Sequence, residues 1–134
     1  MKKFILSSVI FLALTVTSLA ANPPAIEMNQ GDYTVDNICQ GKSGTTVQKS
    51  FYDAAGKVIK IKADCLDGQF NGLVKKYNEN GKIRLKAHYA KGQLNGRVQL
   101  HDGNGNLIYY FDYTNGSPGP RMHYDNKGQA IQVN

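Results

Sequence analysis

The chain has 134 residues, which is enough for one domain of ordinary size and too few for two. Its formal net charge is +6, but two of the basic residues, Lys2 and Lys3, belong to an apolar leader. The rest has fourteen basic and ten acidic residues, a net charge of +4. This mild excess favours an acidic partner or surface and does not indicate nucleic-acid binding, so we expect no nucleic-acid partner.

Residues 1–20 have the pattern of a secretory signal peptide. Two lysines precede an apolar run from Phe4 to about Val16, and a small-residue pattern ends at Ala20. The run is too short to span a membrane, and no second apolar run follows it. We therefore expect cleavage near Ala20 and a mature chain that is periplasmic or secreted.

Residues 21–50 lack the repeat pattern that follows them and are predicted to form an N-terminal cap segment. Cys39 in this segment and Cys65 beyond it are the two cysteines of the chain. Export favours a disulfide between them, which would close a loop of about 27 residues and stabilise the fold by roughly 3 to 4 kcal/mol. Two buried free thiols are the alternative. A metal or redox site is disfavoured because the sequence has no Cys-x-x-Cys pair and no histidine at ligand spacing.

From residue 51 onward the sequence repeats with a period of about 24 residues. Gly56, Gly81, Gly105 and Gly128 recur at intervals of 25, 24 and 23, and Gly68, Gly92 and Gly116 recur at 24 and 24. Periods of this size indicate a supersecondary unit that stacks on its neighbours. Residues 51–134 are therefore predicted to form one repeat domain.

Each unit combines a strand pattern with turn residues. In residues 82–89, KIRLKAHY, apolar and polar side chains alternate with the period of two that a strand requires. Asn-Gly or Asp-Gly pairs, which tolerate the positive φ of tight hairpin turns, stand at 67–68, 71–72, 80–81, 95–96, 104–105 and 115–116. We predict an all-β protein in which repeated β-hairpins of about 24 residues form one elongated antiparallel meander sheet.

Stacked hairpins would align equivalent residues into columns on one apolar face. The face is formed by Ile59, Ile61, Ala63 and Cys65, by Ile83, Leu85, Ala87 and Tyr89, and by Leu107, Tyr109, Phe111 and Tyr113. Because Cys65 stands in a tyrosine column, a bridge to Cys39 would tie the cap segment to the first hairpin. The register of the second strand in each unit stays open, because LVKKY and RVQLH do not alternate cleanly.

At these positions the chain resembles the MORN-type repeats, in the bacterial variant found in antitoxin proteins of toxin–antitoxin systems. The shared pattern is an aromatic residue, a turn ending in NGK, an alternating strand and Tyr-x-x-Gly-x-x-x-Gly, clearest in residues 77–96, YNENGKIRLKAHYAKGQLNG. The resemblance covers about residues 51–128. The sequence departs from the MORN-type pattern at His101, at Cys65 and at GSPGP in the third unit. It implies a binding protein, and in its concrete form an exported antitoxin or immunity protein that occludes a toxin.

The opposite face of the predicted sheet carries the candidate partner-binding residues. The basic ones are Lys60, Lys62, Arg84 and Lys86. They would attract an acidic protein or anionic lipid headgroups, although lysines that only keep a sheet soluble are the alternative. In the third unit Ile108 and Tyr110 place apolar surface there, and Tyr110 is expected to be the main interface anchor unless a terminal cap covers it.

An enzymatic interpretation would depend on the column Asp64, His88 and Asp112, in which an imidazole would lie between two carboxylates. No nucleophile or oxyanion site accompanies this column, and a flat sheet supplies no water-excluding pocket. We therefore expect a solvated charge ladder, with no catalysis, cofactor or metal. The expected partner is a protein, with a toxin as the concrete case, and an envelope accessory module on an anionic membrane surface is the alternative. The oligomeric state stays open.

Overall fold

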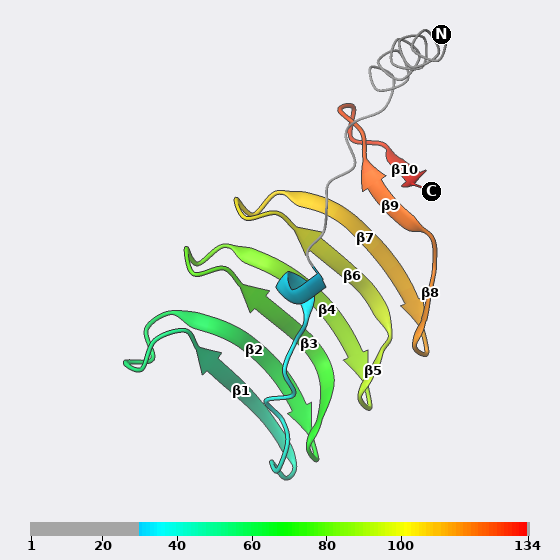
Figure 1. Ribbon diagram of the computed structural model, residues 1–134. Coiled ribbons are helices and arrows are strands. Elements are labelled where there is room, and N and C mark those ends of the chain that lie inside the picture. Colours follow the sequence, from blue (N-terminus) through cyan, green and yellow to red (C-terminus); the bar gives the residue numbers. More distant parts are fainter. Residues whose placement is uncertain (1–29, 134) are drawn as a thin grey trace, which may run out of the picture.

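The structure, a computed structural model, describes residues 30–133, and the predicted signal peptide lies outside this range. The described chain forms one ten-stranded antiparallel sheet, preceded by a short 3-10 helix, η1 (Gln30–Tyr33) (Figure 1). The prediction of an all-β meander of hairpins is therefore confirmed. In residues 30–133 no helix has the length and apolar character needed to cross a membrane.

The strands lie side by side in chain order, with two short strands, β5 and β8, pairing beside β4 and β7. Their bounds are β1 (Thr45–Phe51), β2 (Ile59–Leu66), β3 (Gln69–Tyr77), β4 (Ile83–Ala90), β5 (Gln93–Leu94), β6 (Gly96–His101), β7 (Leu107–Thr114), β8 (Ser117–Pro118), β9 (Arg121–Tyr124) and β10 (Ala130–Val133). Each hairpin thus stacks on the one before it, as short connections between sequential strands favour.

The turns along the lower edge in Figure 1 are two-residue turns with positive φ at both positions. They are Asp67-Gly68, Lys91-Gly92 and Asn115-Gly116, with φ of 47, 49 and 47° for the first residue and 85, 83 and 85° for the glycine. Positive φ at both central residues is the type I′ turn, whose twist matches that of the flanking strands. Lys91 adopts this conformation without being Asn or Asp, so no Asn-Gly or Asp-Gly pair signals this turn.

Two of the six predicted turns are wrong. Asn71-Gly72 lies inside β3, and Asn95-Gly96 leads directly into β6. A Cβ at Gly72 would lie 2.7 Å from Oδ2 of Asp64 on the neighbouring strand, so only glycine fits there. A glycine inside a strand often marks such a close approach rather than a chain reversal.

At the opposite edge, the turns after β1 and β6 are closed by aspartate side chains, whereas Asn80 accepts the corresponding N–H of Lys82 in the turn after β3. Oδ1 of Asp102 accepts hydrogen bonds of 2.9 Å from the backbone N–H groups of Asn106 and Asn104. Oδ1 of Asp53 accepts one of 2.7 Å from Val58. Because these bonds favour the ionised carboxylate, they lower the pKa of both aspartates.

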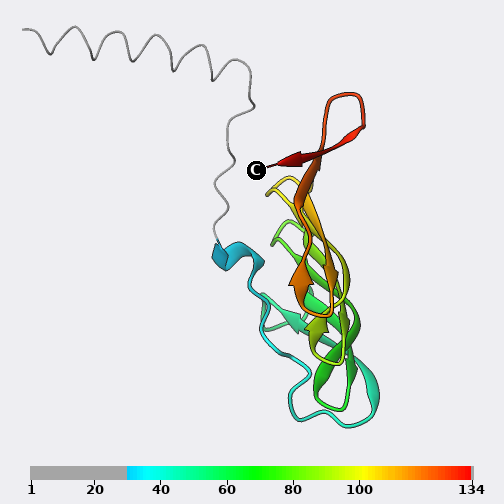
Figure 2. The ribbon, with the colours of Figure 1, turned by 90° about the vertical axis from the view of Figure 1, so that its right-hand side faces the viewer.

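The N-terminal segment of residues 30–44, here called the strap, crosses one face of the sheet from β4 towards β1 (Figures 1 and 2). We call this the inner face and the opposite one the outer face. Val35 and Ile38 of the strap pack against the buried cluster of the first units, and Tyr33 packs against the next cluster. The strap ends at residue 44, because residues 45–51, predicted to belong to the cap or to begin the repeat domain, form the first strand of the sheet.

The apolar columns predicted from the repeat contribute to the buried clusters of the inner face, except for Tyr109 and for Ile59, Ile83 and Leu107, which precede a register shift; these four belong to neither cluster. Two clusters of buried residues form the core: one contains Cys39, Ile61, Ala63, Cys65, Phe70 and Val74, and the other contains Leu85, Ala87, Val98 and Leu100. The strap covers the first cluster more completely than the second. Burial of this surface at about 25 cal/mol per Å² is the main favourable contribution to the stability of the stack.

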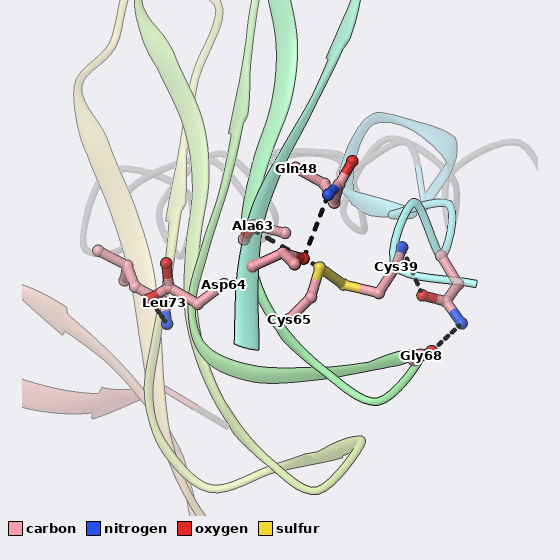
Figure 3. Close-up of a disulfide and its surroundings, with 9 residues drawn as sticks. Cys39, Gln48, Ala63, Asp64, Cys65, Gly68 and Leu73 are labelled. Atoms are coloured by element: carbon pink, nitrogen blue, oxygen red, sulfur yellow. Dashed lines mark hydrogen bonds between the residues drawn. A yellow bond between two sulfur atoms is a disulfide. The ribbon is translucent and has the colours of Figure 1, made fainter. Parts of the chain in front are cut away.

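The predicted disulfide between Cys39 and Cys65 is confirmed, with a Cα–Cα distance of 5.5 Å (Figure 3). Hydrogen bonds from residues before and after Cys39 also hold the strap to the turn of the first hairpin. Nδ2 of Asn37 donates to the carbonyl of Gly68 at 3.3 Å, and the N–H of Gly44 donates to Oδ1 of Asp67 at 2.7 Å. The strap is therefore held to the first hairpin covalently and at the turn.

Opening the disulfide should destabilise the protein strongly. A Cys39→Ser/Cys65→Ser variant should lose about 3 to 4 kcal/mol of unfolding free energy, because the unfolded chain regains the entropy of the closed loop. Urea unfolding followed by circular dichroism measures this loss. Dithiothreitol should destabilise the wild type by a similar amount and leave the variant unchanged; a loss below about 1 kcal/mol would contradict the role given to the bridge.

The turn aspartates should make stability depend on pH in the acid range. Folding lowers their pKa from the ordinary 3.8, so their contribution is complete above that pH and is lost as the pH falls through the lowered folded-state values. The stability of the wild type should therefore fall more steeply below pH 3.8 than that of an Asp53→Asn/Asp102→Asn variant. Urea midpoints over this range test the difference, with Asp36→Asn as the control; equal slopes for wild type and double variant would contradict it.

Candidate functional site

Four lysines from neighbouring strands form one row on the outer face. Backbone pairing places Lys49 of β1 opposite Lys62 of β2, Lys62 opposite Lys75 of β3, and Lys75 opposite Lys86 of β4. We call these residues the lysine row. Because neighbouring strands lie about 4.8 Å apart, the row spans about 14 Å.

The lysine row has no acidic partner in its own register. It continues through Gln99 of β6, Tyr110 of β7 and Met122 of β9. The ion pairs Arg84–Asp32 and Arg97–Asp112, which lie within residues 30–133, include no lysine of the row. Like charges directly opposite each other destabilise a strand pair, so three successive lysine pairs do not serve the stability of the sheet.

The lysine row contains Lys62 and Lys86 of the predicted basic residues, but neither Lys60 nor Arg84. Nη2 of Arg84 lies 2.7 Å from Oδ2 of Asp32, and the guanidinium lies 5.2 Å from the centre of the Tyr33 ring. The predicted outward position of Arg84 is therefore wrong, because its side chain binds the strap. Lys60, whose ammonium lies 5.7 Å from the centre of the Tyr52 ring, also sits at a register shift, where strict alternation of faces fails.

Sequence reasoning missed Lys49 and Lys75. Lys49 lies in the segment predicted to be a cap, where the sequence has no repeat pattern that would indicate a strand. Lys75 belongs to LVKKY, whose adjacent lysines serve opposite faces. Nζ of Lys76 is directed to the inner face, where it donates hydrogen bonds to the strap carbonyls of Thr34 at 2.8 Å and Gly31 at 3.2 Å. Adjacent side chains of a strand face opposite sides, so the pair Lys75-Lys76 was the available signal that one of the two lysines faces outward.

The end of the outer face formed by β6, β7 and β9 carries two tyrosines and the ion pair of Arg97 with Asp112. The guanidinium carbon of Arg97 lies 4.1 Å from the centre of the Tyr110 ring, and its Nε and Nη2 donate to the two carboxylate oxygens of Asp112 at 2.8 and 2.9 Å. These bonds from Arg97 lower the pKa of Asp112. The ring of Tyr124 lies 5.4 Å from that of Tyr110, centre to centre.

The predicted exposure of Ile108 and Tyr110 is wrong. Ile108 is 9% exposed and Tyr110 only 5%, because Arg97 and Tyr124 cover the tyrosine ring. The accessible aromatic side chain at this end is Tyr124, which is 45% exposed. Tyr110 therefore lies beneath Arg97 and Tyr124. It could contribute to binding only by positioning these two side chains.

The column of Asp64, His88 and Asp112 is not assembled. Their strands, β2, β4 and β7, are separated by β3 and β6, so the three side chains are not neighbours. Asp112 is bound by Arg97, and Oδ2 of Asp64 accepts the N–H of Leu73 at 3.0 Å. Among residues 30–133 no group of three or more His, Cys, Asp or Glu side chains could hold a metal ion.

The inner face has an open groove where the strap leaves it. The cavity measures about 490 Å³ and lies over β4, β6 and β7. Its lining includes Ala87, Tyr89, Leu94, Val98, Phe111 and Tyr113, with Tyr33 and Thr34 of the strap on one side. Burial raises the pKa of Tyr89. The lining of the groove is mainly apolar, with tyrosine side chains and Thr34 adding polar atoms, so the groove fits apolar side chains.

Comparison of the chain with protein-family models gave no match, and comparisons with curated proteins and with solved structures gave none either. The resemblance to MORN-type repeats and the antitoxin function that it implies therefore stay predictions. Function has to be inferred from the lysine row, the aromatic end of the outer face, and the groove.

The two tyrosines of the outer face should respond differently to truncation. Tyr110→Ala should lower the unfolding free energy by about 3 kcal/mol, because it removes a buried ring. Tyr124→Ala should cost about 0.5 kcal/mol or less, because that side chain is largely exposed. Urea unfolding of the two variants measures both effects, and equal losses would contradict the burial of Tyr110 beneath Arg97.

Proposed function

We propose that the protein is a non-catalytic binding protein whose outer face recognises an acidic partner protein. The lysine row is the observation that carries this proposal. Four like charges in direct register weaken the pairing of four strands, and an anionic partner would relieve that repulsion on binding. Because the row is shorter than about two Debye lengths at physiological salt, its charges attract a partner jointly.

The aromatic end of the outer face supports the same proposal. Arginine and tyrosine dominate the residues that contribute most to protein interfaces. Arg97 and Tyr124 are accessible, and Arg97 is fixed by two hydrogen bonds to Asp112. A partner that pairs acidic groups with the lysine row could pack an apolar residue on Tyr124. Because Asp112 already holds Arg97, little order would have to be created in this side chain on binding.

The concrete form of the proposal is an exported antitoxin or immunity protein that neutralises a toxin by covering it. The disulfide fits an oxidising compartment outside the cytoplasm. Occlusion requires a complementary rigid surface and no reaction, which agrees with a site made of lysines and stacked aromatic side chains. The resemblance to antitoxin repeats supports a toxin as the acidic partner.

An anionic membrane surface is the alternative ligand of the lysine row. A flat face with four lysines would gain about 1 kcal/mol per lysine near anionic headgroups. In that case the protein would be an envelope accessory module. The two ligands differ in stoichiometry, because a protein partner binds one to one and a membrane does not.

Charge reversal in the middle of the row tests the proposal. A Lys62→Glu/Lys75→Glu variant of the mature chain, residues 21–134, should lose the partner that the wild type captures from native envelope extract. The captured protein, once purified, should bind the wild type one to one in calorimetry and the variant at least about tenfold more weakly. Lys57→Glu/Lys127→Glu, which changes the same charge in turns away from the row, is the matched control.

Three results would reject the acidic protein partner. The first is unchanged binding by the Lys62→Glu/Lys75→Glu variant. The second is equal loss in the control variant, which would indicate an effect of net charge alone. The third is salt-sensitive binding of the wild type to phosphatidylglycerol vesicles with no stoichiometric protein captured, which would assign the row to a membrane surface.

A further inference from the structure

The inner face carries a furrow that runs across the strands. Its floor consists of small side chains, with Ala63 opposite Val74, Val74 opposite Ala87, and Val98 next on β6. Larger side chains form its two walls: Ile61, the buried Lys76, Leu85, Leu100 and Tyr109 on one side, and Phe70, Tyr89, Leu94 and Tyr113 on the other. The first row follows from the register of the sheet, whereas the second is interrupted by Gly72 and Gly96, which pair with Tyr89 and Tyr113.

The strap already occupies the first part of this furrow. Val35 and Ile38 pack on the cluster that includes Ala63 and Val74. The ammonium of Lys76 takes two strap carbonyls as acceptors, which fixes the backbone of the strap above the sheet. A polypeptide segment therefore occupies this part of the furrow. Its residues 34–37 form neither helix nor strand, and its apolar side chains lie between the two walls.

The furrow continues beyond the strap as the open groove over β4, β6 and β7. The same small row, Ala87 and Val98, forms its floor and ends at Phe111, which lies opposite Val98, while Tyr89 and Leu94 lie beside it. The hydroxyl of Tyr33, at the strap side, donates to the carbonyl of His101 at 3.0 Å and so does not require a ligand. The volume of about 490 Å³ is within the range of pockets that hold small ligands, and it can take a few apolar side chains.

We infer that this groove binds an extended apolar segment of a partner polypeptide, as the first part of the furrow binds the strap. The continuity of floor and walls with the strap interface is what selects a polypeptide as the occupant. The site is distinct from the lysine row, because successive residues such as Lys86 and Ala87 face opposite sides of the sheet. The protein would then contact partners through both faces.

The strap sequence itself is the probe for this site. A fluorescein-labelled peptide of residues 32–38, DYTVDNI, should bind the mature chain with a Kd of roughly 0.1 to 1 mM in fluorescence anisotropy. A peptide carrying Tyr33→Ser and Val35→Ser should not bind, because it lacks the apolar side chains at alternate positions. In amide NMR spectra the wild-type peptide should shift residues 85–98 and 111–113 and leave residues 61–74 unchanged.

A matched pair of variants locates the binding. Leu94 lines the groove, whereas Gln93, its neighbour in β5, is exposed and outside the lining. Leu94→Lys should weaken the peptide at least about tenfold, and Gln93→Lys should leave it unchanged. The amide shifts of the wild type keep the test decisive if Leu94→Lys fails to fold.

Other outcomes would overturn the inference. One is the absence of binding at about 5 mM peptide, and another is binding that Leu94→Lys does not weaken. If only an Ile26→Asp/Met28→Asp variant binds the peptide, the chain's own N-terminal segment fills the groove. If sedimentation shows a dimer that Leu94→Lys dissociates, the occupant is a second copy. Lys62→Glu/Lys75→Glu should leave the peptide affinity unchanged, so failure here is separable from failure of the proposed function.

Discussion

The register of backbone hydrogen bonds between neighbouring strands is the constraint on which every surface of this protein depends. Type I′ turns such as Lys91-Gly92 close one end of the hairpins, and turns tied by Asp53 or Asp102 close the other. A slip of one residue would move every side chain of a strand to the opposite face. The lysine row on one face and the small-residue furrow on the other exist only in this register.

The sequence predicted the strands whose two faces differ clearly in polarity. It did not predict which way a side chain faces where that direction depends on pairing with another strand. KIRLKAHY alternates cleanly, and the glycine period placed its equivalents. In LVKKY the two lysines lie on opposite faces, and which one faces outward follows only from the pairing with β2 and β4. Arg84 was misplaced because a register shift and the acidic Asp32, far away in sequence, determine its direction. The Asn-Gly pair at 71–72 failed because glycine there accommodates Asp64 rather than a turn.

The strap divides the molecule into two chemically different surfaces. The disulfide and Lys76 hold it on the inner face, so the outer face stays free and the furrow is only partly filled. One face offers regularly spaced charge and the other offers an apolar channel. A repeat sheet can therefore present two chemically distinct surfaces, because equivalent residues of successive hairpins line up in rows.

We propose that the lysine row serves a partner and not the fold. The most direct measurement is the unfolding free energy of a Lys62→Gln/Lys75→Gln variant at low and at high salt. Removing two adjacent like charges should raise stability by about 0.5 to 1 kcal/mol at roughly 10 mM salt, and the gain should vanish near about 1 M salt, where charges are screened. A variant that is less stable than the wild type at low salt would show that the lysines support the sheet, and would contradict the account.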